Sequence, residues 1–463
     1  MIRRCLSAIQ LFLFIVLVTF SSNLNGQELK RKSSLGIMMQ PLNDSLITTL
    51  KLKSNTGLYI SDVLAGSTVE NLGMKRGAVL KKLNGVQIKT IPDVFNALED
   101  FRADDSITIE YVFNGKTIIR TGKGIARPKE KYEKANITYG QVKYRDNILR
   151  SILYTPKGKK NTPVVFYLQG YTCGSFEFPF SSQHASLKLI RDWVDAGFSV
   201  YRIEKPGVGD SQSKINCNDG NFTQEVIAFK EGYKALLNSQ AVDTDNIFLF
   251  GHSMGGIIAP LLNEVKSPKG IITYGTISKP WYDYMKDLYT LQPKIFNTPQ
   301  SQISENNKIG LPFLEDMIVN KMPAKDLAAN NDYKNYLGSQ FAELERGSYI
   351  GRSIAYWQTL CEVDIPEAWR NINTNVLAMH GEFDIQAIDD TGAKGIVALV
   401  KDKTKATYKL VNKTEHGFVR FNSMQENVNA LQNGTYRQHA AKNYNQEVAQ
   451  ITIDWIKAKA KAE

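Results

Sequence analysis

Residues 247–256 read IFLFGHSMGG, four apolar residues followed by the pattern Gly-x-Ser-x-Gly. The apolar run predicts a buried strand, and the residues that follow favour a helix. A strand that turns directly into a helix brings the backbone so close together that side chains at Gly251 and Gly255 would collide. We therefore expect a strained turn that exposes the hydroxyl of Ser253 at a helix N-terminus, where backbone N–H groups favour a developing negative charge.

Strand and helix patterns alternate on both sides of this turn, over residues 137–463. Such alternation predicts an α/β fold in which helices cover both faces of the sheet. The predicted strands are Pro163–Leu168, Phe198–Ile203, Asn246–Phe250, Gly270–Tyr274, Asn375–Met379 and Thr407–Val411. The clearest helices are Ser186–Ala196, Phe222–Ser239 and Tyr444–Ala458.

A serine hydroxyl is a weak nucleophile near neutral pH, so it needs a base and an acid that orients the base. Among five histidines, His416 lies in a predicted loop after the last strand and is the best candidate base. His439, near the terminal helix, is the alternative. The acid is expected after the strand that ends at Met379, where both Glu382 and Asp384 stand.

These motifs resemble the α/β-hydrolase superfamily, near its serine aminopeptidase-like and esterase-like branches. In that family the nucleophile, acid and base follow one another in the order Ser, Asp or Glu, His, which fits Ser253, Asp384 and His416. The resemblance favours Asp384 over Glu382, because the family places the acid after Gly-x-x at this turn. Residues 205–211 also look like the family's Gly-x-Gly-x-Ser loop.

The resemblance further implies an oxyanion hole made by the backbone N–H groups of Met254 and Tyr171. Gln169 stands where the family usually has His, which leaves the backbone donor in place. Cys173 and Cys217 follow strands that are neighbours in this fold, on the edge that carries the active site. We therefore predict a disulfide bond that tethers the oxyanion loop.

Residues 275–374 are too many for one crossover helix between two predicted strands. We predict a cap over Ser253 at about residues 280–370. Its aromatic side chains either line an apolar pocket or pack the cap against the sheet. An aminopeptidase would need carboxylates close to Ser253 to hold the ammonium group of its substrate, and the candidates are Glu315, Asp316, Glu343 and Glu345.

Short strand patterns separated by Gly, Asn and Pro turns fill residues 31–126. The segments 34–37, 57–63 and 72–77 resemble a PDZ domain of the bacterial, protease-associated type, although Ala78 replaces a usual Asp. The resemblance implies that an extended peptide is added to a sheet edge. The expected groove residues are Leu35, Gly36, Ile37, Val94 and Leu98; alternatively, the module only packs on its neighbour or props open a cleft.

Two further segments are the N-terminus and the stretch between the two predicted domains. Arg3 and Arg4 precede the apolar run Ile9–Phe20 and a small, polar stretch, which predicts a signal peptide over residues 1–26 and an exported, periplasmic or extracellular protein. The alternative is an uncleaved signal anchor. Residues 127–136, rich in Lys and Glu, are predicted to be a linker.

Composition excludes several classes of function. The chain has 463 residues and a formal net charge of +11, but no dense Lys/Arg blocks, which argues against nucleic-acid binding. Its cysteine spacing matches no zinc pattern, so we expect no metal and no cofactor. The leading hypothesis is an exported serine hydrolase that cleaves carboxylic esters through an acyl-serine intermediate. The alternatives are a peptidase or aminopeptidase acting on short peptides, and a non-catalytic scaffold that binds peptides.

Overall fold

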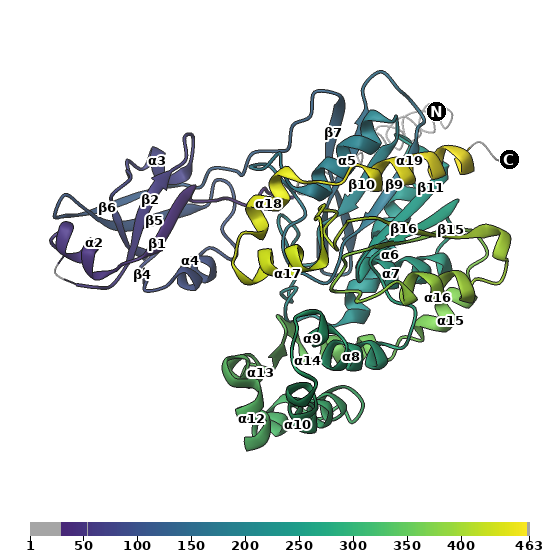
Figure 1. The fold of residues 1–463 in the computed structure, drawn as a ribbon. Coiled ribbons are helices and arrows are strands. Elements are labelled where there is room, and N and C mark those ends of the chain that lie inside the picture. Colours follow the sequence, from purple (N-terminus) through teal and green to yellow (C-terminus); the bar gives the residue numbers. More distant parts are fainter. Residues whose placement is uncertain (1–28, 53, 461–463) are drawn as a thin grey trace, which may run out of the picture. The chain divides into compact units, whose positions relative to one another are not determined.

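The computed structural model describes residues 29–52 and 54–460. The predicted signal peptide therefore lies outside the described residues. Two β-sheets dominate the structure, a larger one built from residues 135–411 and a smaller one built from residues 37–123. The larger sheet includes β11 (Asp243–His252), which is followed by α7 (Gly255–Leu261) (Figure 1), and the Gly-x-Ser-x-Gly motif spans the turn between them.

The larger sheet has eight strands, of which six run parallel. The remaining two form an antiparallel hairpin at one edge. The strands are β7 (Ala135–Tyr144), β8 (Asn147–Pro156), β9 (Pro163–Leu168), β10 (Ser199–Ile203), β11 (Asp243–His252), β12 (Gly270–Tyr274), β15 (Asn375–Gly381) and β16 (Ala406–Val411). Their order across the sheet is β16-β15-β12-β11-β9-β10-β8-β7.

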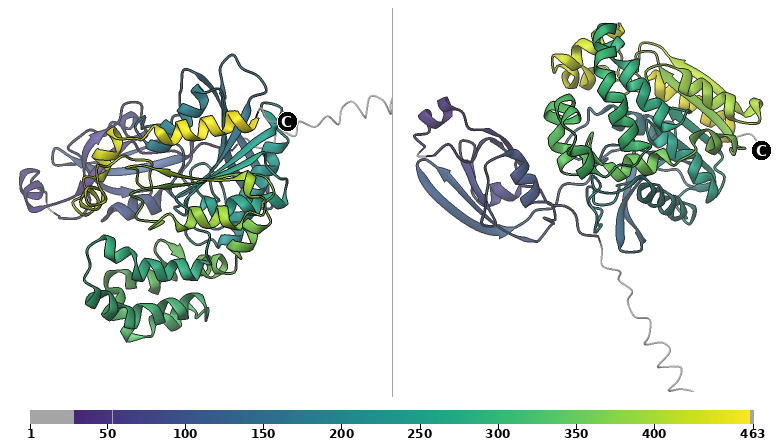
Figure 2. Two further views of the ribbon diagram at one scale, coloured as in Figure 1. Left: turned by 45° about the vertical axis from the view of Figure 1, so that its right-hand side comes forward. Right: turned by 90° about the horizontal axis from the view of Figure 1, so that it is seen from below.

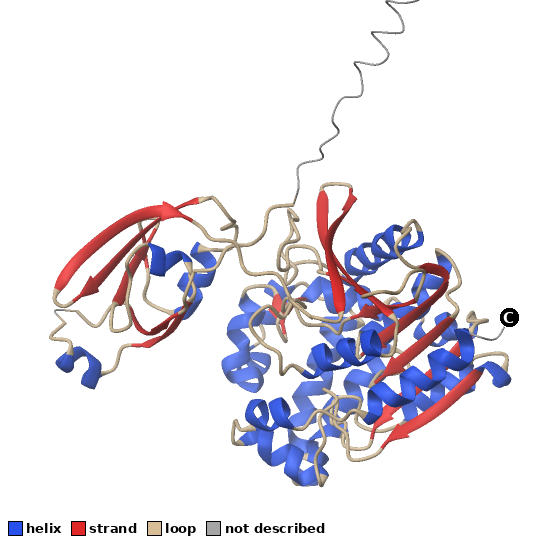
Figure 3. Ribbon diagram, turned by 90° about the horizontal axis from the view of Figure 1, so that it is seen from above, coloured by secondary structure: helices blue, strands red, loops and turns tan. Residues whose placement is uncertain are grey.

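Both faces of this sheet are buried under helices (Figure 3). In β9, Val164 and Phe166 point into one core and Val165 and Tyr167 into the other, as the two-residue period of a strand requires. The first core is completed by α6 (Phe222–Leu237), α7 (Gly255–Leu261) and α16 (Thr391–Leu399). The second is completed by α5 (Ala185–Asp195) and α19 (Glu447–Ala460).

The six strands predicted for this sheet are all present, with bounds that differ by a few residues at most. The linker prediction is wrong in part, because β7 begins at Ala135 and pairs with β8 along its whole length. Glu130, inside the same segment, is buried and forms an ion pair with Arg202. The segment is therefore fastened to the sheet and does not act as a free spacer.

Between β12 and β15 the chain forms a helical insertion, at the place predicted for the cap. In Figure 2 these helices gather in one group, drawn in green. The insertion consists of α8 (Trp281–Thr290), α9 (Gln292–Ile295), α10 (Gln300–Ile318), α11 (Ala324–Ala328), α12 (Asn331–Leu337), α13 (Phe341–Glu345), the hairpin β13 (Ser348–Tyr349) and β14 (Arg352–Ser353), α14 (Ile354–Cys361) and α15 (Ile365–Arg370).

The smaller sheet is antiparallel and follows the order β1-β2-β3-β5-β6, with β4 paired to β3. In the same region, a capping box closes the start of helix α4 (Ile91–Ala97): the Thr90 side chain accepts the Asp93 N–H, and the Asp93 side chain accepts the Thr90 N–H. The strands are β1 (Ile37–Pro41), β2 (Leu58–Val63), β3 (Val79–Leu83), β4 (Val86–Gln87), β5 (Ser106–Phe113) and β6 (Lys116–Lys123), and the helices are α2 (Asp44–Thr49), α3 (Thr68–Asn71) and α4 (Ile91–Ala97).

Candidate active site

Ser253 stands on the turn between β11 and α7 in the strained conformation that the motif predicts. Its φ is +55°, in the left-handed region that side chains other than glycine seldom adopt. A Cβ at Gly251 would lie 2.5 Å from the carbonyl oxygen of Gly255, and a Cβ at Gly255 would lie 2.0 Å from that of Leu168. A residue with a side chain therefore does not fit at either position. The N–H of Ser253 donates to the Tyr274 carbonyl at 2.9 Å, which ties the turn to β12.

Asp384 and His416 meet beside this turn. His416 Nδ1 lies 2.7 Å from Asp384 Oδ2, and both residues are buried. The other carboxylate oxygen, Oδ1, accepts the backbone N–H groups of Gln386 and Ala387, each at 2.8 Å. The loop after β15 thus fixes the carboxylate, and the carboxylate fixes the imidazole.

The charges of this pair support each other. Burial opposes ionisation of Asp384, but the charge of His416 and the hydrogen bond to it lower the Asp384 pKa to about 2. Burial also lowers the pKa of His416, and the negative charge and hydrogen bond of Asp384 outweigh it, so that this pKa is raised above its ordinary value. The pair is built to stabilise an imidazolium.

The two alternatives left open by the sequence lie elsewhere. His439 stacks on the ring of Phe421 and its Nε2 bonds the Arg420 carbonyl at 2.8 Å. Glu382 is exposed and accepts the backbone N–H of Lys413. Neither residue lines the cavity that contains Ser253 and His416.

Two further side chains hold the loop of His416, and neither was predicted from the sequence. His252 Nε2 donates to the His416 carbonyl at 2.8 Å, and the Tyr274 hydroxyl donates to the Glu415 carbonyl at 2.8 Å. Burial lowers the pKa of His252 to about 3, so its ring is neutral and keeps this role over a wide pH range. No local pattern reveals these contacts, because they join segments more than 140 residues apart.

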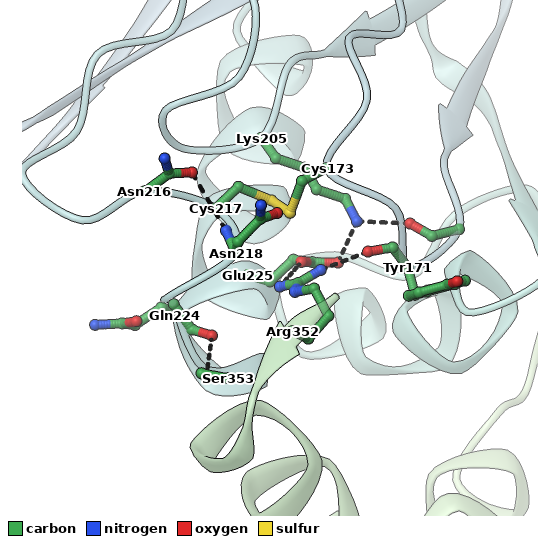
Figure 4. The surroundings of a disulfide bond; sticks show 12 residues. Tyr171, Cys173, Lys205, Asn216, Cys217, Asn218, Gln224, Glu225, Arg352 and Ser353 are labelled. Carbon is green, nitrogen blue, oxygen red and sulfur yellow. Dashed lines mark hydrogen bonds and ion pairs between the residues drawn. A yellow bond between two sulfur atoms is a disulfide. The ribbon is translucent and has the colours of Figure 1, made fainter. Parts of the chain in front are cut away.

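The loop after β9 lies against the serine. A Cβ placed on Gly170 would be 3.6 Å from Ser253 Oγ. Within residues 29–52 and 54–460, no backbone hydrogen bond is donated by the N–H groups of Tyr171 or Met254. The predicted disulfide bond between Cys173 and Cys217 is present, with a Cα–Cα distance of 5.8 Å, and holds this loop (Figure 4).

A cavity of about 240 Å³ is lined by Ser253, His416, Tyr171 and Met254 together with mostly apolar residues. No carboxylate is among the lining residues, so Glu315, Asp316, Glu343 and Glu345 lie outside it. Of the cap aromatics, Trp281, Tyr284 and Trp357 line the cavity, and the rings of Trp281 and Trp357 stack 5.7 Å apart. The polar lining residues are Tyr171, Ser253, Thr276, Tyr284, Gln292, Gln386 and His416.

The mostly parallel sheet, the helices on both faces and the strained serine turn after β11 occur together in one known architecture. The chain has the α/β-hydrolase fold. A family model described as serine aminopeptidase, S33, matches residues 182–344. The match includes Ser253 and much of the cap but ends before Asp384 and His416.

Similar solved structures share little sequence with this chain. Est1E from Butyrivibrio proteoclasticus with bound ferulic acid is 15% identical, with a TM-score of 0.40, and the match covers 65% of this chain and 100% of that one. Acetyl xylan esterase 1 from Thermoanaerobacterium sp. is 13% identical, with a TM-score of 0.39, and the match covers 69% of this chain and 87% of that one.

Curated relatives match a short part of this chain. A probable periplasmic serine endoprotease, DegP-like, from Chlamydia trachomatis is 30% identical over 84 residues, which are 18% of this chain and 17% of the relative. Serine protease HTR4 from Bos taurus is 29% identical over 104 residues, which are 21% of this chain and 21% of the relative. The chain thus spans less than a quarter of the length of these relatives.

Among residues 29–52 and 54–460, no group of three or more His, Cys, Asp or Glu side chains could hold a metal ion. In the same part of the chain, no helix combines the length and apolar character that crossing a membrane requires.

Proposed function

We propose that this protein is a serine hydrolase that cleaves carboxylic esters through an acyl-serine intermediate. One observation carries the proposal: a serine on a positive-φ turn shares a cavity with a buried histidine whose other ring nitrogen is bonded to a carboxylate. Nucleophile, base and orienting acid are the three parts that acyl transfer by serine needs.

In the proposed reaction, Ser253 Oγ attacks the carbonyl carbon of the ester while its proton passes to His416 Nε2. The Nδ1–H of His416 keeps donating its hydrogen bond to the Asp384 carboxylate, whose negative charge stabilises the imidazolium. The carbonyl oxygen becomes an anion that accepts the backbone N–H groups of Tyr171 and Met254. The intermediate collapses, and the alcohol leaves with the proton from His416. Water, activated by the same imidazole, then releases the acid and restores Ser253.

The apolar cavity favours esters over aminoacyl peptides, because an ammonium group buried there would meet no carboxylate. We expect p-nitrophenyl esters of short to medium acyl chains to give a kcat/KM at least about 100-fold above that of aminoacyl p-nitroanilides, which corresponds to about 2.7 kcal/mol. A panel of both substrate types measures the ratio. A higher kcat/KM for the anilides would replace the esterase proposal with the aminopeptidase alternative.

The pH profile should carry the signature of His416. This histidine must be neutral to accept the serine proton, and its pKa is raised above the ordinary value of 6.5. We therefore expect kcat/KM to rise with pH through one ionisation above pH 6.5. Initial rates on p-nitrophenyl acetate across a buffer series test this. A profile that is already flat at pH 5.5 would contradict a raised pKa.

Export fits the cysteine chemistry. The bond between Cys173 and Cys217 is of a kind that persists in oxidising compartments. The predicted signal peptide over residues 1–26 agrees with that environment, as does the word periplasmic in the names of some relatives. We include export, to the periplasm or the medium, in the proposal.

We further propose that residues 31–126 form a PDZ domain that binds peptide C-termini. One cavity is lined by all five predicted groove residues: Leu35, Gly36, Ile37, Val94 and Leu98. Beside it, β1 pairs with β2 alone and forms one edge of the smaller sheet. A free edge next to a groove is what strand addition of a peptide requires.

A fluorescent peptide tests this second proposal. We expect a labelled peptide ending in Val with a free carboxylate to bind about 10- to 100-fold more tightly than its C-terminal amide, because charge-assisted hydrogen bonds are lost in the amide. Fluorescence polarisation on the full chain measures both affinities. Equal affinities for the two peptides would contradict recognition of a C-terminus.

A further inference from the structure

A buried ion cluster lies beside the loop that carries Tyr171 and Cys173 (Figure 4). Lys205 follows β10, Glu225 lies in the first turn of α6, and Arg352 comes from β14 in the cap. Lys205 Nζ and Arg352 Nη2 each lie 2.8 Å from a different oxygen of the Glu225 carboxylate. The side chains of Lys205, Glu225 and Arg352 are 0%, 3% and 2% exposed.

The two cations in this cluster also bind the backbone of the neighbouring loop. Lys205 Nζ donates to the Gly170 carbonyl at 2.6 Å. Arg352 Nη1 donates to the Tyr171 carbonyl, and its guanidinium lies over the Tyr356 ring, 3.6 Å from the ring centroid. Two consecutive carbonyl groups of the loop are thus held by two cations that share one carboxylate.

The position of these bonds matters for the N–H of Tyr171. The Gly170 carbonyl and the Tyr171 N–H belong to one planar peptide group. A cation bound to the carbonyl oxygen fixes the plane of that group and draws electron density toward the oxygen, which makes the N–H a stronger donor. Arg352 fixes the next peptide in the same way. The N–H between the two held carbonyls is the one assigned above to the oxyanion.

A contribution to the free energy of unfolding does not explain why these three charged side chains are buried together. Burying ions costs free energy that their attraction only partly returns, and apolar replacements of similar volume are often neutral or stabilising. Here two cations face one carboxylate, so one positive charge is left over for the loop. That excess is directed at backbone carbonyls next to Ser253, where a negative charge would develop.

We infer that Lys205 and Arg352, held by Glu225, are positioning residues that orient and polarise the Tyr171 N–H of the oxyanion hole. The inference rests on the serine hydrolase function proposed above. Because Arg352 belongs to the cap, the arrangement also couples the position of the cap to the donor. Tyr171 itself contacts the cap, with its ring 6.2 Å from that of Trp357.

The variant Lys205→Met tests the inference with little risk to the fold, because Glu225 and Arg352 remain as a neutral pair. Loss of a whole oxyanion donor typically lowers kcat by 10²- to 10³-fold, so loss of its support should lower kcat by about 10- to 100-fold. KM for p-nitrophenyl acetate should stay within about twofold, since the effect belongs to the transition state. Arg352→Met is the second variant, and Lys214→Met, at a lysine that is 78% exposed, is the control.

Inhibition by phenylboronic acid separates positioning from mere folding. Its boron accepts an oxygen lone pair of Ser253 while the hydroxyl proton passes to His416 Nε2, so that a tetrahedral boronate anion forms that resembles the intermediate. The inhibition constant of Lys205→Met should rise by about the same factor as kcat/KM falls. A purely structural role would instead reduce the number of sites titrated by a fluorophosphonate and leave the inhibition constant unchanged.

The alkaline limb of the pH profile gives an independent readout. Burial lowers the pKa of Lys205 to about 8, with Glu225 opposing the shift and Arg352 adding to it. The charge is present below that pKa and is lost as pH rises through it. We expect kcat/KM of the wild type to fall above about pH 8 and that of Lys205→Met to stay level there. An equal fall in kcat/KM above pH 8 in both proteins would contradict the positioning role of Lys205.

The outcomes separate the two proposals. If the wild type hydrolyses esters and is labelled by a fluorophosphonate, while Lys205→Met matches it in kcat and in boronate inhibition, the inference is wrong and the hydrolase proposal stands. If the wild type is neither active nor labelled, both fall. Parallel losses in kcat/KM and boronate affinity, with all sites titrated, support the inference.

Discussion

Replacing Ser253 with alanine should lower kcat on p-nitrophenyl esters by about 10⁶-fold, the loss typical when the nucleophile of a serine hydrolase is removed. The hydroxyl is the atom that forms the acyl intermediate, and no neighbouring group can take its place on the turn. Initial rates at saturating substrate, with circular dichroism to verify folding, measure the effect. Residual activity above about 1% of the wild type would contradict the assignment.

Two controls isolate the hydroxyl from the backbone. Ser253→Gly relieves the positive φ of this residue but also lacks the hydroxyl, so it should be as inactive as Ser253→Ala. Ser181→Ala removes an exposed serine that does not line the cavity and should retain full activity. An active Ser253→Gly variant would show that the turn, and not its oxygen, carries the effect.

Asp384→Asn should lower kcat by about 10⁴-fold with the fold intact. The amide oxygen can still accept the N–H groups of Gln386 and Ala387, so the loop should keep its shape. The amide nitrogen would face His416 Nδ1 and favour the tautomer whose Nε2 carries the proton. That imidazole can no longer accept the serine proton. Steady-state kinetics at the pH optimum of the wild type measure the loss.

Glu382→Gln is the matched control, two residues away on the same loop. Its carboxylate is exposed and bonds the Lys413 N–H, an interaction that the amide oxygen can retain. Its kcat should stay within about twofold of the wild type, as expected for a surface change. If the losses were reversed between these variants, Glu382 would be the acid and the geometry at Asp384 would have no catalytic meaning.

Much of the larger sheet was predictable from sequence because its central strands are buried on both faces. Segments such as Pro163–Leu168 and Gly270–Tyr274 consist mostly of apolar residues, and they match β9 and β12 residue for residue. The turn at Ser253 was predictable for a different reason, since only glycine fits at positions 251 and 255. The juxtaposition of Asp384 and His416 followed from chain order in a resembling family.

Other features have no local signal. The hairpin β7–β8 was missed because it is an edge element with mixed polar and apolar residues, next to a stretch rich in Lys and Glu. The helix α2 has no buried residue and therefore no apolar stripe. The cluster of Lys205, Glu225 and Arg352 joins three elements that are distant in sequence. Charged residues are usually exposed, so the sequence alone offers no reason to expect these three to be buried.

The proposed function depends on Ser253 being an activated nucleophile. Treating the full-length protein with a fluorophosphonate and mapping the adduct by peptide mass spectrometry tests it most directly. We predict one adduct, on the peptide that contains Ser253, whose formation parallels the loss of esterase activity. An unmodified Ser253 peptide in protein that has lost its activity, or an adduct on another residue, would contradict the account.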